Sequence, residues 1–200
     1  VAPTVNVTDN LAGTANRSTG SIAYTYQFSE AVTGLTASDF TMANGLITSI
    51  SGSGTTYTVT VAPTLGVASG TIDLTLQAGA VQDAAGNTNS ANTNNSQAID
   101  TLAPTGLTLD PIASDNTVNA AAKAAGFSIG GAVEAGTSVS VLWGNQTRTA
   151  TVSGSTWTLA YITNQIPADG AQLITVTATD AAGNTSQVKR TITVDTVAPT

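Results

Sequence analysis

The chain has 200 residues, of which 12 are acidic and 5 basic, and it contains neither cysteine nor histidine. Their absence excludes disulfides, thiolate or imidazole metal sites, and cysteine or histidine catalysis. The formal net charge of −7 argues against nucleic acid and anionic membranes as partners, since both attract clusters of lysine and arginine, and favours hard cations. No segment approaches the roughly 18 consecutive apolar residues of a membrane span, so no membrane insertion is expected.

Two short phrases recur along the chain. Asp-Ala-Ala-Gly-Asn occurs at residues 83–87 and again, 97 residues later, at 180–184. Asp-Thr, an apolar residue, Ala and Pro occur at 100–104 and 195–199, and the chain opens within the same phrase. A period of 97 residues corresponds to a small domain rather than to a solenoid repeat. We therefore predict two tandem domains, 1–101 and 102–200, joined by a proline-containing linker, and a parent protein longer than this segment.

Both halves show nearly strict alternation of apolar and polar residues, as at Ile22, Tyr24 and Tyr26. This pattern predicts antiparallel strands with one buried face. The predicted strands are 4–8, 21–29, 38–43, 46–50, 55–62, 71–78 and 95–100 in the first domain, and 106–110, 125–132, 137–143, 146–153, 155–161, 172–179 and 186–195 in the second. No segment shows helical periodicity. About seven short strands per hundred residues predict an all-β, Greek-key immunoglobulin-like sandwich for each domain, without a disulfide and with Trp157 in the core.

Three acidic residues are expected at one pole of the second domain. In this topology the loops after the second and sixth strands lie where the first strand begins. Glu134 occupies the first of these loops, Asp180 begins the other, and Asp100 is the last residue before the linker. Carboxylates without nearby lysine or arginine need a compensating cation, and oxygen ligands alone fit Ca²⁺. We therefore predict an inter-domain Ca²⁺ site at Asp100, Glu134 and Asp180.

The first domain repeats this pattern in part. Glu30 and Asp83 occupy the positions that correspond to Glu134 and Asp180. They predict an N-terminal half-site, and Asp195, at the far end of the second domain, predicts a C-terminal half-site. The remaining aspartates are interpreted as surface or turn residues.

Each of these acids also has a simpler interpretation. Asp83 and Asp180 could satisfy the backbone of their own loops, with Gly86 and Gly183 adopting positive φ. The glutamates could be solvated loop residues, and Asp100 and Asp195 could mark the ends of strands. The calcium interpretation is favoured because all three positions recur and map to one pole.

Longer motifs connect the chain with a known family. In the second half these motifs are residues 115–120, 131–137, 154–159, 177–184 and 195–199. In the first half they are residues 28–35, 38–41 and 83–87. With these motifs the sequence resembles the bacterial immunoglobulin-like repeats of very large surface adhesins that are exported by type I secretion and carry RTX tails. The two halves resemble sister types of repeat.

The resemblance implies a function as well as a fold. It implies an extracellular segment on the bacterial cell surface, in a biofilm-type adhesin, where tandem repeats form a stalk stiffened by Ca²⁺. Its partners would be the neighbouring repeats of the same chain, and we expect a monomer that is not an enzyme. The alternative is a carbohydrate- or ice-binding module that uses a Thr/Asn-rich sheet face or the loops around Trp143.

Overall fold

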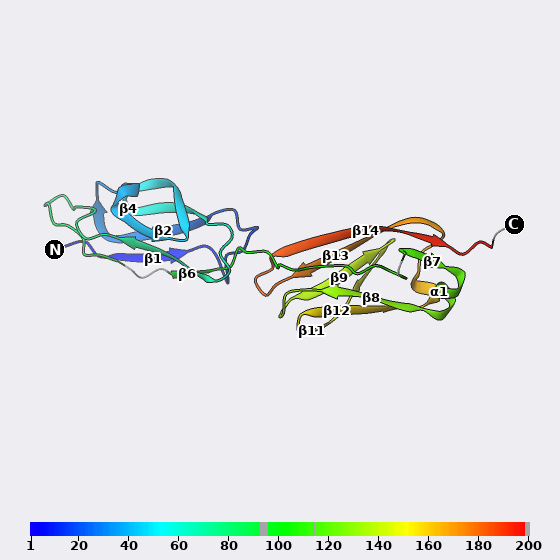
Figure 1. The fold of residues 1–200 in the computed structure, drawn as a ribbon. Helices are drawn as coiled ribbons and strands as arrows, with labels where there is room; N and C mark the ends of the chain where they lie inside the picture. Colours follow the sequence, from blue (N-terminus) through cyan, green and yellow to red (C-terminus); the bar gives the residue numbers. More distant parts are fainter. Residues whose placement is uncertain (93–95, 114, 199–200) are drawn as a thin grey trace. The chain divides into compact units, whose positions relative to one another are not determined.

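A computed structural model describes residues 1–92, 96–113 and 115–198. The chain forms two compact units, Val1–Leu102 (unit 1) and Ala103–Thr200 (unit 2). Strands dominate both units (Figure 1), and the sheets of each unit enclose an apolar core of their own. The predicted pair of all-β sandwiches is thereby confirmed.

Unit 1 contains one sheet with the strand order β1-β2-β4 and another with the order β3-β5-β6. The elements are β1 (Val5–Asp9), β2 (Ile22–Val32), a 3-10 turn η1 (Ala37–Asp39), β3 (Phe40–Ala43), β4 (Gly45–Pro63), β5 (Gly70–Leu76) and β6 (Ser96–Ile99). The predicted alternation holds, since Ile22, Tyr24 and Tyr26 are fully buried. The predicted start of the last strand, residue 95, lies outside the described residues.

Two strand predictions for unit 1 need correction. The segments 46–50 and 55–62 are one continuous strand, β4, which folds back on itself so that Thr48 donates a hydrogen bond to the Thr60 carbonyl (3.2 Å). Gly52, with φ of 103°, bends the strand without ending it. The second strand also extends to Val32, with an irregular register after Gln27. Glu30 therefore lies within β2 rather than in a loop.

Unit 2 contains a sheet with the order β10-β9-β13-β14-β7 and a sheet with the order β11-β12-β8. The elements are β7 (Thr117–Asn119), α1 (Ala120–Ala125), β8 (Phe127–Ala132), β9 (Ser138–Trp143), β10 (Gln146–Thr149), β11 (Thr151–Ser153), β12 (Thr156–Tyr161), η2 (Thr163–Gln165), β13 (Gly170–Thr179) and β14 (Thr185–Asp195). The pairs are antiparallel except that β7 runs parallel to β14.

Three predictions for unit 2 were wrong. The segment 106–110 forms no regular strand, although the amides of Thr108 and Asp110 donate to β8 carbonyls. The predicted strand 146–153 is divided between the two sheets as β10 and β11. Residues 120–125 form a short helix, whose first turn is capped by the side chain of Asn119 (2.9 Å to the Ala122 amide).

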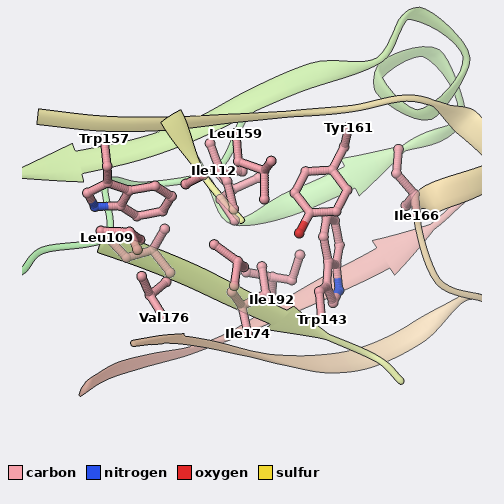
Figure 2. Packing of buried hydrophobic residues seen from close by; sticks show 14 of the residues in the cluster. Leu109, Ile112, Trp143, Trp157, Leu159, Tyr161, Ile166, Ile174, Val176 and Ile192 are labelled. Atoms are coloured by element: carbon pink, nitrogen blue, oxygen red, sulfur yellow. The ribbon is translucent and has the colours of Figure 1, made fainter. Parts of the chain in front are cut away.

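The core of unit 2 lies between its two sheets. Figure 2 shows Trp157 and Tyr161 pointing from β12 toward side chains of the opposite sheet, including Ile174 and Val176. Trp157 is 1% exposed, as predicted, and its indole nitrogen donates to the Thr108 carbonyl (2.9 Å). Trp143 is equally buried and packs edge-on against Tyr161 at 4.8 Å between ring centroids. Neither tryptophan is exposed for binding a ligand.

Candidate functional site

The repeated phrase forms a closed loop in unit 1. Asp83 accepts hydrogen bonds at one carboxylate oxygen from the amides of Ala85 and Asn87 (both 2.8 Å), and at the other from the Asn87 side chain (2.7 Å). The Asp83 amide in turn donates to the Asn87 carbonyl, and Gly86 closes the turn with φ of 83°. The loop thus holds the carboxylate in place with its own backbone.

The second copy forms the same loop in unit 2. The amide and the side chain of Asn184 donate to the two carboxylate oxygens of Asp180 (2.8 and 2.9 Å), and Gly183 has φ of 88°. The simpler interpretation of both aspartates, that they satisfy their own loops, is confirmed. A carboxylate offers about four lone pairs, so these hydrogen bonds still leave capacity for a cation.

The hydrogen bonds have an electrostatic consequence in unit 1. The side chain of Asn87 and the amides of residues 87 and 85 lower the pKa of Asp83, although partial desolvation acts in the opposite direction. Donors stabilise the ionised form of a carboxyl group and disfavour its protonation. Asp83 is therefore an anion at neutral pH, as a cation ligand must be.

Glu134 connects its loop with the beginning of unit 2. One oxygen of its exposed carboxylate accepts hydrogen bonds from the amide and the hydroxyl of Thr105 (2.8 and 3.0 Å). The sequence pattern located Glu134 but gave no sign of Thr105, which lies 29 residues earlier. In unit 1, Glu30 is partly buried on β2.

The strand register shows how the segments that carry the predicted acids lie within each unit. In unit 2, Ser138 pairs with Thr179, so the loop of Glu134, just before β9, lies beside the start of the Asp180 loop. In unit 1, Thr33 pairs with Gln82, which places the end of β2 beside the residue that precedes Asp83. These registers bring the loops of Glu134 and Asp180 together at one pole of unit 2, whereas in unit 1 Glu30 lies within β2, three residues before Thr33.

Asp100 directly follows β6, the last strand of unit 1, and Asp195 is the last residue of β14, the last strand of unit 2. Each accepts a hydrogen bond from the amide two residues later, from Leu102 (3.3 Å) and Val197 (3.2 Å) respectively. The threonine after Asp100 is fully buried. Thr101 donates to the Thr64 carbonyl (2.7 Å) and accepts from the Val67 amide (3.1 Å).

The threonine after Asp195 is bound by a residue that the sequence gave no reason to select. The amide and hydroxyl of Thr196 donate to the carboxylate of Asp169 at 2.8–2.9 Å. These hydrogen bonds from Thr196 lower the pKa of Asp169. The sequence interpretation had placed Asp169 in a turn, next to Gly170, and its partner lies 27 residues away.

The described residues contain no group of three or more acidic side chains that could hold a metal ion. What unit 2 offers at the pole of Glu134 is a pair of carboxylates, one exposed and one ordered by its loop. Such a pair can contribute oxygen ligands to a hard cation but does not complete a coordination shell alone.

The two units match two related family models. One model described as a bacterial Ig-like domain matches residues 1–99, and a second with the same description matches residues 112–196. The chain belongs to the bacterial Ig-like family. A search of curated proteins finds no match.

Solved structures share this bacterial Ig-like architecture. The chain is similar to a 1.5-MDa bacterial ice-binding adhesin, with 21% identity over 98% of this chain and 65% of that chain and a TM-score of 0.50. It is also similar to a Ca²⁺-stabilised adhesin that helps an Antarctic bacterium to bind ice, with 24% identity over 97% and 50% of the two chains and a TM-score of 0.49. The bacterial Ig-like chain thus spans about two thirds or half of these structures. No helix in its described part is long and apolar enough to cross a membrane.

Proposed function

We propose that these two bacterial Ig-like domains are an extender segment of a large adhesin stalk on the bacterial cell surface. The observation that supports this best is that the chain enters and leaves unit 2 at opposite poles. Thr105 is held at the pole where β13 ends, and Thr196 is held by Asp169, directly before β13 begins. A strand of ten residues is about 30 Å long, so the unit adds that length between entry and exit.

The aromatic residues support an extender rather than a sugar-binding module. Carbohydrate sites typically expose aromatic rings, yet all nine aromatic side chains lie in the two cores, eight of them buried and Phe127 partly buried. Bacterial Ig-like domains are, moreover, in general not enzymes. The neighbouring repeats of a longer chain are the partners that we propose.

The extender proposal can be tested by length. Small-angle scattering of this chain and of a tandem duplicate should show the maximum dimension increasing by an equal amount for each added unit. A compact arrangement, in which the duplicate gains only the small increment expected of a globular particle, would contradict the proposal.

We also propose that Asp100, Glu134 and Asp180 bind Ca²⁺ together, and that Glu30 and Asp83 and, separately, Asp195 contribute to further sites of the same kind. The donor set fits this cation because it consists of oxygen ligands alone. Glu134 is exposed, and one of its oxygens accepts no hydrogen bond from any described residue. Bound Ca²⁺ would neutralise the negative charge of the carboxylates that bind it.

Thermal melting tests the calcium proposal. A cation that binds only the folded state raises its stability by mass action, so the melting temperature of unit 2 should be higher in millimolar Ca²⁺ than in EDTA. Glu134→Gln and Asp180→Asn should each reduce this shift, while Asp115→Asn, a matched change at an acid outside the proposed set, should leave it intact. Equal melting temperatures of the unaltered chain in Ca²⁺ and EDTA would contradict calcium binding.

A further inference from the structure

β7 and β14 form a parallel contact that joins the first and the last strand of unit 2. Tension along a stalk would act on this contact. Thr117 pairs with Thr193 and Val118 with Val194, and the Thr193 amide donates to the Asn116 carbonyl (3.0 Å). The two valines are buried at 0% and 1% exposure. A short strand near the beginning of unit 2 is therefore bonded directly to its last strand.

The direction of both strands determines how tension acts on this contact. β14 is antiparallel to β13, so it runs from the pole of Thr105 to the pole of Thr196, and β7 runs the same way. Tension on the chain ends pulls β7 back toward the first pole and β14 toward the second. The strands are thus displaced along their axes, and their hydrogen bonds are strained together rather than one after another.

The segment that precedes β7 is held in a different manner. Its contacts are divided among β8, β12 and β14: the Thr108 and Asp110 amides donate to β8 carbonyls, the Trp157 indole donates to the Thr108 carbonyl, and Arg190 donates to the Leu109 carbonyl (2.6 Å). Contacts that are divided among three elements can break one after another. In β7 and β14, by contrast, consecutive residues face a single partner strand.

We propose that the β7–β14 contact is the force-bearing element of unit 2, which keeps the domain folded when the stalk is under tension. This inference rests on the extender function proposed above. Unit 1 has a shorter version of the same contact, because among its described residues only Ala15 bridges in parallel to Ile99, with hydrogen bonds of 2.8 and 2.9 Å to the neighbouring Ala98 and Asp100. Unit 1 is therefore expected to unfold at a lower force than unit 2.

Single-molecule stretching of the full 200-residue chain from its two ends, in EDTA, tests the proposal. The two units should give two unfolding events, and Thr193→Pro, which removes the donor to Asn116, should lower the force of the unit 2 event only. Loss of one hydrogen bond, about 1 kcal/mol net, corresponds to about fivefold faster unfolding. Forced unfolding depends on the unfolding rate rather than on the equilibrium stability.

The matched control is Val176→Ala, a core change on β13. If both variants lower the melting temperature of unit 2 by the same amount, Thr193→Pro should reduce the unfolding force more than Val176→Ala does. Equal reductions would overturn the proposal, because the force would then follow overall stability. An unchanged force in the folded Thr193→Pro variant would overturn it as well.

A second design applies if Thr193→Pro does not fold. The chain has no cysteine, so the double variant Thr117→Cys, Thr193→Cys can form a single disulfide across the contact, between register partners suitably close for one. Stretching of the oxidised form should show no unfolding event for unit 2, and reduction of the disulfide should restore that event. A disulfide from Thr151→Cys and Thr158→Cys, between β11 and β12, should shorten the extension without changing the force.

A unit 2 event that persists at its original force after the first cross-link would place the resistance in the segment before β7 and overturn the proposal. This failure is distinguishable from failure of the extender function. The scattering experiment reports added length whether or not the β7–β14 contact resists force.

Discussion

At the scale of single residues, the Asp83 carboxylate links loop structure with acidity. Because hydrogen bonding lowers its pKa in the folded state, this group stabilises unit 1 above its unfolded pKa of about 4, and the contribution is lost as the pH falls through the lower folded value. We predict that in Asp83→Ala the melting temperature of unit 1 falls less than in the unaltered chain as the pH is lowered from about 6. Asp39→Ala, which removes a carboxylate outside this loop, is the control, and an acid dependence in Asp83→Ala equal to that of the unaltered chain would contradict the prediction.

Thr101 gives a second prediction at this scale. Its buried hydroxyl satisfies the Thr64 carbonyl and the Val67 amide, and valine has nearly the same shape without the hydroxyl. Thr101→Val should therefore destabilise unit 1 by about 1–3 kcal/mol, the cost of buried polar groups left unpaired. Thr101→Ser keeps the hydroxyl and should lose less. Denaturant unfolding measures both, and equal losses would assign the effect to packing.

At the scale of the elements, Gly131 determines how the first segment of unit 2 lies on β8. A Cβ atom at this position would overlap the carbonyl of Thr108, which is backbone and cannot rotate away. We predict that Gly131→Ala destabilises unit 2 by about 1–3 kcal/mol, a typical cost of overpacking. Gly20→Ala, which meets no atom within 4 Å, should be nearly neutral. A Gly131→Ala variant with the original melting temperature would show that the segment 106–110 moves without cost.

The elements also show what the sequence could predict. Alternation located most strands because a buried face requires an apolar residue at every second position. It could not separate β10 from β11, since a strand that changes sheets keeps the same alternation. It also missed α1, whose six residues are too few for helical periodicity and which depends on a local cap at Asn119. The irregular segment 106–110 has few paired backbone groups, and its contacts are tertiary.

The candidate site was predictable to a similar extent. Asp83 and Asp180 stood out because their loop is local and repeated, and five consecutive residues contain every hydrogen-bonding partner. The pairs Thr105–Glu134 and Asp169–Thr196 join residues 29 and 27 positions apart. A single sequence contains no signal for such pairs, since their proximity depends on the folded topology.

At the scale of the whole molecule, each unit has its own core, and no buried residue in the described part of the chain belongs to both cores. A cavity in one core should therefore destabilise that unit alone. Leu74 is 1% exposed in the core of unit 1. We predict that Leu74→Ala lowers the free energy of unfolding of unit 1 by about 2–5 kcal/mol, so that only the melting temperature of unit 1 falls in calorimetry. Val176→Ala, the matched change in unit 2, should lower only the other transition. If either variant shifted both transitions equally, the two units would unfold as one cooperative body, and a stalk built from them could not lose one domain under load while its neighbour stays folded.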